Sequence, residues 1–298
     1  MSTSALLPNR QQAWQDEGCL VLPGFKSTSD CRSACARARE LVDAFEPDAH
    51  SGTFSTRDRS RVADTALLAS AEALHCFFEE EAHDDQGRLR VPKAQAINKI
   101  GHALHTLDPV FTRFSGGPEL AALAADLGLA QPQVWQSQLI FKQPRIGGEV
   151  GWHQDASFFA TTPQTVLTFW FALEDATLDN GCLWVADGLP AGGRQTPLRE
   201  QYLCEGRDPA RLHDLTGGRL RMQALDATPW PTTGQARPLE VAAGSLIVFH
   251  GLLPHCSAAN RSANSRLAYT LHATDAGAVY SPLNWLQRSP DRPARGFL

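Results

Sequence analysis

A histidine and an aspartate, His153 and Asp155, stand one residue apart in the glycine-rich and aromatic segment GGEVGWHQDASFF. In an extended segment, side chains two residues apart leave the same face, so this imidazole and this carboxylate are close enough to chelate one ion. Such a pair suits a borderline divalent metal such as Fe(II), and a facial ligand set needs one more histidine. The triplet alone is a weak signal, because it arises by chance in many proteins and also fits a polar turn before a buried strand.

Two histidines about a hundred residues later are candidates for the third ligand. His250 ends the apolar run SLIVF, and His255 follows the turn at residues 251–254. Spacing alone does not choose between them. His250 also fits a histidine at a strand end whose ring is hydrogen-bonded to a backbone carbonyl.

An arginine opens a strand-like segment eleven residues past His255. Its alternation places four residues on one face: Arg266, Ala268, Thr270 and His272. The planar guanidinium binds a carboxylate through two parallel hydrogen bonds, which lysine cannot reproduce, so an arginine pointing into a barrel predicts a receptor for an organic acid. The alternative is a surface arginine on an edge strand.

The secondary structure that must position these residues is predicted to change from mainly helical to mainly β near residue 133. Before residue 133, helical periodicity and capping signals predict helices at residues 9–16, 31–45 and 118–127, with one early strand at residues 19–22. Apolar runs rich in aromatic and β-branched residues then predict strands at residues 134–141, 165–173, 182–185, 245–249 and 266–273. This pattern indicates a mainly β sandwich or barrel with flanking helices. Residues 188–238, rich in Gly, Pro, Arg and Thr, are expected to form a long loop of the lid or binding type.

The composition argues against several classes of protein. The chain has 298 residues, 43% of them hydrophobic, and can bury a sizeable core. A net charge of −5 without a Lys/Arg block argues against nucleic acid as a partner. The sequence offers no membrane-spanning run or leader, and its seven cysteines lack a C-x-x-C pair, so we expect a cytoplasmic protein with reduced thiols. It carries no signal of oligomeric state.

Several long segments, taken in order, resemble the phytanoyl-CoA dioxygenase family of iron and 2-oxoglutarate dioxygenases. These segments are residues 97–111, 140–159, 174–184, 255–270 and 281–287. The resemblance implies a double-stranded β-helix, a cupin-like jelly roll, in one domain over residues 1–298. Its parts are a mostly helical region at residues 1–133 and a jelly-roll core at 134–280, with the long loop at 188–238.

The resemblance also implies roles for residues at matching motif positions. His153, Asp155 and His255 would be the iron ligands, and Arg266 with Ser257 would hold the distal carboxylate of the cosubstrate 2-oxoglutarate.

Three further residues fall where family members line the cosubstrate pocket: Lys99, Gln138 and Trp170. Gln138 departs from the methionine expected in relatives. Without the resemblance, Lys99 would be interpreted as a solvated lysine and Trp170 as a core residue.

The implied reaction is oxidative decarboxylation of 2-oxoglutarate by O2, with ascorbate as a reductant, coupled to hydroxylation of a substrate carbon. Asp155 favours hydroxylation over halogenation, because halogenating relatives have a small residue there. We expect a small or medium organic substrate, with an acyl-CoA-like molecule as the alternative. Phosphate-binding candidates are scattered, and a solvated loop also explains them: Arg145, Arg194, Arg199, Arg207, Arg211, Arg219 and Arg221. The competing functions are a metal-dependent hydrolase or binding module on the same jelly roll, and a catalytically silent relative.

Overall fold

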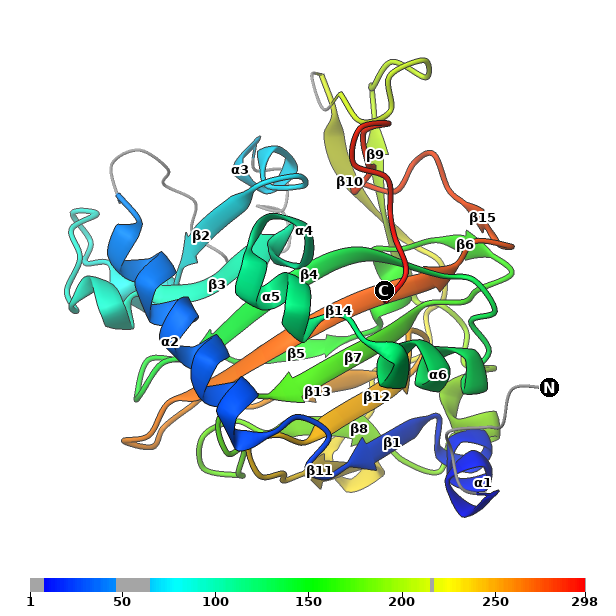
Figure 1. Ribbon diagram of the computed structural model, residues 1–298, viewed down its shortest axis with the longest axis horizontal. Helices are drawn as coiled ribbons and strands as arrows, with labels where there is room; N and C mark the ends of the chain where they lie inside the picture. Colours follow the sequence, from blue (N-terminus) through cyan, green and yellow to red (C-terminus); the bar gives the residue numbers. More distant parts are fainter. Residues whose placement is uncertain (1–7, 47–64, 215–216, 298) are drawn as a thin grey trace.

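The computed structural model describes residues 8–46, 65–214 and 217–297 (Figure 1). Its largest element is a seven-stranded sheet in the order β1-β12-β7-β14-β4-β3-β2, with antiparallel neighbours throughout. The strands are β1 (Cys19–Leu22), β12 (Leu246–His250), β7 (Leu167–Ala172), β14 (Arg266–Asp275), β4 (Pro132–Lys142), β3 (Ile97–His102) and β2 (Leu74–Phe78). All five apolar runs predicted after residue 133 contribute strands, four of them to this sheet.

A four-stranded antiparallel sheet faces the large one and lies behind it in Figure 1. Its strands, in spatial order, are β11 (Ala236–Leu239), β8 (Leu183–Ala186), β13 (His255–Ser257) and β5 (Val150–His153). Apolar side chains from both sheets pack into one cluster, with Trp170 and Ile247 from the large sheet and Leu183 and Val185 from the small one. The mainly β jelly roll expected from the sequence is therefore confirmed.

Helices cover the opposite face of the large sheet, where α2, α5 and α6 lie across its strands (Figure 1). The helices are α1 (Pro8–Glu17), α2 (Thr28–Ala44), α3 (Thr65–Ala69), α4 (Leu104–Leu107), α5 (Pro109–Phe114) and α6 (Pro118–Asp126). Helix α2 begins at a capping box, in which Ser27 and Asp30 satisfy each other's backbone N–H groups. None of the described helices is long and apolar enough to cross a membrane.

Strand β14 divides its side chains between these two layers, as its alternation predicted. Leu267, Tyr269 and Leu271 pack into the core beneath the helices, whereas Arg266 and His272 face the space between the sheets. This alternation places polar groups inside the jelly roll without disturbing the helix-facing core.

The N-terminal region differs from the prediction of helices with one early strand. It also contains β2 and β3, which extend the large sheet beyond β4. Polar residues interrupt both runs, LHCFF and INKIGH, and β3 is buried on both faces, so neither run shows the alternation of a half-buried strand.

The predicted long loop at residues 188–238 was also wrong in part. It contains an antiparallel hairpin of β9 (Glu200–Glu205) and β10 (Arg219–Ala224), which projects from the top of the molecule in Figure 1. Strand β10 is almost entirely exposed, so its sequence lacks an apolar face that would identify it. The remaining short elements are β6 (Thr161–Thr162), β15 (Val279–Tyr280), η3 (Glu80–Ala82), η4 (Lys93–Gln95), η5 (Asp155–Ser157), η6 (Pro190–Gly193) and η7 (Thr233–Gln235).

Candidate metal and cosubstrate site

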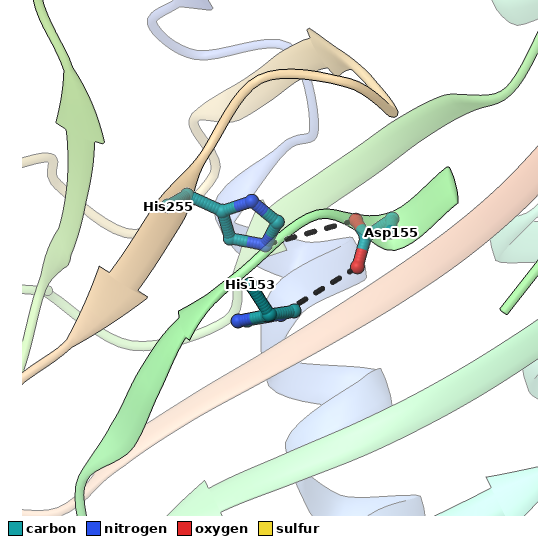
Figure 2. A group of neighbouring side chains, drawn as sticks. All are labelled: His153, Asp155 and His255. Atoms are coloured by element: carbon teal, nitrogen blue, oxygen red, sulfur yellow. Dashed lines mark ion pairs between the residues drawn. The ribbon is translucent and has the colours of Figure 1, made fainter. Parts of the chain in front are cut away.

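Two histidines and one aspartate come together at one end of the small sheet (Figure 2). His153 ends β5 and His255 begins β13, where the two are direct cross-strand partners with ring centroids 4.1 Å apart. Asp155 opens the 3-10 turn η5, with Gln154 before it in an extended conformation. The Nε2 atom of His153 lies 3.6 Å from Oδ1 of Asp155, and the Nε2 atom of His255 lies 3.7 Å from Oδ2. One potential ligand atom from each residue lies within 4.8 Å of the others, so the group could hold a metal ion.

Hydrogen bonds to backbone carbonyls fix the tautomer of both imidazoles. Nδ1 of His153 lies 2.9 Å from the carbonyl of Gly151, and Nδ1 of His255 lies 3.0 Å from the carbonyl of Leu253. Because a carbonyl only accepts hydrogen bonds, each Nδ1 must carry the hydrogen and each neutral ring leaves a lone pair on Nε2. In this tautomer Nε2 is the ring atom that faces Asp155 in both histidines and the atom through which each would ligate a metal.

Asp155 is ionised at neutral pH. Burial by itself would raise its pKa, but the positive charge that the facing imidazoles of His255 and His272 carry when they are protonated in the metal-free site outweighs that effect and holds the pKa well below its usual range. The carboxylate also accepts a 2.5 Å hydrogen bond from the hydroxyl of Thr168, while Nε2 of His272 lies 3.5 Å from Oδ2. No motif in the sequence pointed to Thr168 or His272, although strand alternation already placed His272 on the face of Arg266.

A cavity of about 210 Å³ lies between the two sheets and brings the sequence-predicted site residues together. All eight line it: His153, Asp155, His255, Lys99, Gln138, Trp170, Ser257 and Arg266. A concave cavity with a few convergent polar groups is the usual form of a small-molecule site.

Arg266 supplies a buried cation to this cavity. Its side chain belongs to a residue that is only 1% exposed, and its guanidinium carbon lies 5.5 Å from the ring centre of Trp170. Across the described parts of the chain, neither Nε nor Nη1 of Arg266 finds a hydrogen-bond partner. Because a buried unpaired charge is strongly unfavourable, this guanidinium fits an anionic ligand such as a carboxylate, and it is not a surface arginine.

Lys99 is buried rather than solvated, at 6% exposure, with its Nζ 5.1 Å from the ring centre of Phe77. Desolvation lowers the pKa of Lys99 to about 7. On the neighbouring strands, Gln138 and Trp170 are the two cross-strand partners of Thr270 on β14. Ser257 is buried at the end of β13. These side chains therefore surround the region into which Arg266 projects.

His250 lies outside the group of potential metal ligands. Its Nδ1 accepts a 3.2 Å hydrogen bond from the backbone N–H of Leu252, rather than donating to a carbonyl as the sequence-based alternative expected. Burial lowers the pKa of His250 to about 4, so its ring is neutral. The tertiary structure thus brings His255, and not His250, to His153 and Asp155.

Three of the arginines considered for phosphate binding have structural partners. Arg207 donates to four backbone carbonyls, Arg194 bonds to Gln15, and Arg221 pairs with Glu205. These contacts favour a structural role for them.

The fold and the site together define a jelly-roll protein with a two-histidine, one-carboxylate group beside a buried arginine. The chain belongs to the phytanoyl-CoA dioxygenase (PhyH) family, whose model matches residues 14–268. It is 40% identical over 297 residues to phytanoyl-CoA dioxygenase domain-containing protein 1 of Bos taurus, covering 97% of this chain and 98% of the relative. It is 42% identical over 279 residues to phytanoyl-CoA dioxygenase 1 of Oryza sativa subsp. japonica, covering 93% and 92% of the two chains.

Solved structures with the same fold include two that contain 2-oxoglutarate. One is the epimerase SnoN from nogalamycin biosynthesis in complex with Fe3+, alpha ketoglutarate and nogalamycin RO, with a TM-score of 0.59, 18% identity and coverage of 96% and 93%. The other is EctD from S. alaskensis with 2-oxoglutarate and 5-hydroxyectoine, with a TM-score of 0.61, 17% identity and coverage of 100% and 86%. At this level of identity, the likeness concerns the fold.

Proposed function

We propose that the protein is an Fe(II)- and 2-oxoglutarate-dependent dioxygenase that hydroxylates a small or medium organic molecule. The observation that carries the proposal is the shared cavity: the two-histidine, one-carboxylate group and the unpaired guanidinium of Arg266 line the same space between the sheets. A hydrolase needs the metal but has no use for a carboxylate receptor beside it. Membership of the PhyH family supports the proposal.

The donor set fits iron. His153 and His255 would each bind it through Nε2, and Asp155 through a carboxylate oxygen, which leaves the remaining positions for cosubstrate and O2. Bound iron supplies the dioxygen chemistry that side chains lack. Arg266 and Ser257 would hold the distal carboxylate of 2-oxoglutarate, and the charge and planar shape of the guanidinium match that carboxylate.

Three further side chains, Lys99, Gln138 and Trp170, would flank the cosubstrate. Together with the ring of Trp170, the buried position of Arg266 would keep water from the carboxylate and so strengthen its binding.

An aromatic wall would position the organic substrate. Phe158, three residues after Asp155, stacks on Tyr202 of β9 with centroids 4.5 Å apart and ring planes inclined by 3°. Both rings line the cavity, as does Trp285 near the C-terminus. These side chains would place an apolar C–H group beside the metal face and exclude water from it. In the balanced reaction, substrate, 2-oxoglutarate and O2 give hydroxylated substrate, succinate and carbon dioxide.

The test is succinate formation from 2-oxoglutarate with Fe(II), O2 and ascorbate, with and without a panel of candidate substrates. Succinate that requires Fe(II) and O2, and that is lost in Asp155→Ala, is the expected result. Metal and 2-oxoglutarate binding without succinate, with every candidate substrate, would instead indicate a catalytically silent relative. Metal-dependent hydrolysis of a candidate substrate at a rate that does not depend on 2-oxoglutarate would indicate a hydrolase.

We also propose that the chain forms one domain in the cytoplasm. The seven-stranded sheet, which combines strands from residues 19 to 275, supports the first part. Seven free cysteines, six of them buried, support the second.

A further inference from the structure

The Asp155 carboxylate has a partner outside the proposed ligand set. Thr168 lies near the start of β7, is 2% exposed, and donates a 2.5 Å hydrogen bond from Oγ1 to Oδ2 of Asp155. We propose that Thr168 is a positioning residue that fixes this carboxylate, so that Oδ1 is the oxygen presented to the metal. The proposal builds on the proposed function, because it takes Asp155 to be a ligand.

The direction of the hydrogen bond follows from the chemistry of the two groups. An ionised carboxylate only accepts, so the threonine hydroxyl must donate. A hydroxyl bonded to a carboxylate forms a short, charge-assisted hydrogen bond, and the low dielectric of a buried site strengthens it. The hydrogen bond therefore restrains the orientation of the carboxylate through Oδ2.

The position of Thr168 in the sheet gives its hydroxyl a fixed location. Its cross-strand partners are His272 on β14 and Phe249 on β12, so a strand lies on each side of it. A β-branched residue also has a restricted χ1 angle. Asp155, in contrast, lies in a 3-10 turn after the last residue of β5. The hydrogen bond thus links the turn that carries the carboxylate to the middle of the large sheet.

The two carboxylate oxygens have different surroundings. Oδ2 accepts the Thr168 hydroxyl and has two imidazole Nε2 atoms near it, that of His272 at 3.5 Å and that of His255 at 3.7 Å. Oδ1 lies 3.6 Å from Nε2 of His153 and accepts no hydrogen bond from Thr168. With Oδ2 engaged by the Thr168 hydroxyl, the carboxylate would bind a metal through Oδ1 alone. A carboxylate bound through one oxygen leaves a coordination position that a carboxylate bound through two would fill.

Two substitutions separate the hydroxyl from the shape of the side chain. Thr168→Val keeps the branched shape and removes the hydroxyl, whereas Thr168→Ser keeps the hydroxyl and removes the methyl group. The neighbouring strand offers a matched control, Thr270→Val. Thr270 lines the same cavity, and its Oγ1 is buried without a hydrogen-bond partner in the described structure.

The experiment is a Mn(II) titration of the full chain at pH 7 without 2-oxoglutarate. Electron paramagnetic resonance measures the concentration of free Mn(II) at each step of the titration. We expect Thr168→Val to weaken Mn(II) affinity by about 10-fold or more, the usual effect of losing a group that orients a metal ligand. Thr168→Ser should restore most of the affinity, and Thr270→Val should match the unmodified protein. Thermal unfolding of each metal-free variant checks the fold, and Thr168→Ala replaces Thr168→Val if the valine variant does not fold.

Two results with the variants would overturn the proposal. Unchanged Mn(II) affinity in Thr168→Val would show that the hydroxyl does not position the carboxylate. Equal losses in Thr168→Ser and Thr168→Val would assign the effect to packing of the methyl group. Mn(II) binding that follows the expected pattern in a protein that forms no succinate would contradict the proposed function but leave the role of Thr168 intact. Failure of the unmodified protein to bind Mn(II) would contradict both.

Discussion

Gln154, the residue between two proposed metal ligands, donates a 2.8 Å hydrogen bond from Nε2 to the carbonyl of Leu252. The same amide donates to the carbonyl of Pro197 at 3.1 Å, and its oxygen accepts from the backbone N–H of Arg199 at 3.0 Å. Leu252 lies in the turn that leads to His255, and Arg199 immediately precedes β9. One fully buried side chain therefore joins the metal-binding segment, the turn before the third ligand and one wall of the cavity.

Gln154→Met should destabilise the protein while keeping a similar side-chain volume, because it leaves the buried N–H of Arg199 and the part-buried carbonyls of Leu252 and Pro197 without these hydrogen bonds. One buried group without a partner costs about 1–3 kcal/mol, and a part-buried carbonyl can turn to water instead, so we expect the free energy of unfolding to fall by roughly 2 kcal/mol, as measured by urea unfolding of the metal-free protein. Gln138→Met is the matched control, for which a change below about 1 kcal/mol is expected. Equal stability of the two variants would show that the Gln154 hydrogen bonds contribute little.

His255→Ala should abolish tight Mn(II) binding, whereas His250→Ala should retain it. The reason is that Nε2 of His255 lies 3.7 Å from the Asp155 carboxylate, whereas His250 lies outside this group and its Nδ1 accepts from the backbone of Leu252. Mn(II) titration of both variants checks this difference. Comparable losses in the two variants would contradict the assignment of the third ligand.

Removing the Arg266 charge should have opposite effects on stability and on ligand binding. Arg266→Met removes a buried, unpaired charge. The free energy of unfolding of the ligand-free protein should therefore rise by roughly 1–4 kcal/mol, the range found when buried charges are replaced by apolar residues of similar volume. The same variant should lose the stabilisation that 2-oxoglutarate gives the Mn(II)-loaded protein, because the carboxylate receptor is gone.

Arg266→Lys serves as the control for charge. It keeps the positive charge but loses the planar guanidinium, so 2-oxoglutarate should stabilise the Mn(II)-loaded variant only in part. Full stabilisation of Arg266→Met by 2-oxoglutarate would rule out Arg266 as the receptor.

Binding of 2-oxoglutarate should weaken as the pH rises through about 7. Desolvation lowers the pKa of Lys99 to about 7, so its amine is protonated below that pH and neutral above it. A protonated Lys99 attracts the dianion and a neutral one does not. His102, which interacts with Lys99, stays neutral in this window because burial holds its pKa well below its usual value.

Isothermal titration calorimetry checks this dependence by measuring the affinity of the Mn(II)-loaded protein for 2-oxoglutarate from about pH 6.5 to about pH 8.5, a range that spans the Lys99 pKa of about 7. Lys99→Met should flatten the profile, whereas Lys93→Met should preserve it, since Lys93 Nζ bonds to the carbonyls of Asp43 and Phe45. A profile that stays steep in Lys99→Met would assign the titration to another group.

Local sequence determined much of the fold. The apolar runs after residue 133 formed strands because β-branched and aromatic side chains suit a pleated, half-buried surface. The alternation along residues 266–273 separated Arg266 from its apolar neighbours, since side chains in a strand alternate strictly between faces. Strand β10, with an exposed and polar pattern, carried no such signal and was missed.

The sequence by itself also determined that His153 and Asp155 could share an ion, because two residues joined by one extended residue need no other part of the chain to meet. Spacing left open whether His250 or His255 joins them, and the family resemblance indicated His255; the tertiary structure decided it, since that choice depends on the pairing of β13 with β5. It likewise decided that Thr168 meets Asp155 and that Lys99 and Arg266 are buried. Strand register and burial arise from packing between distant segments, and no local spacing encodes them.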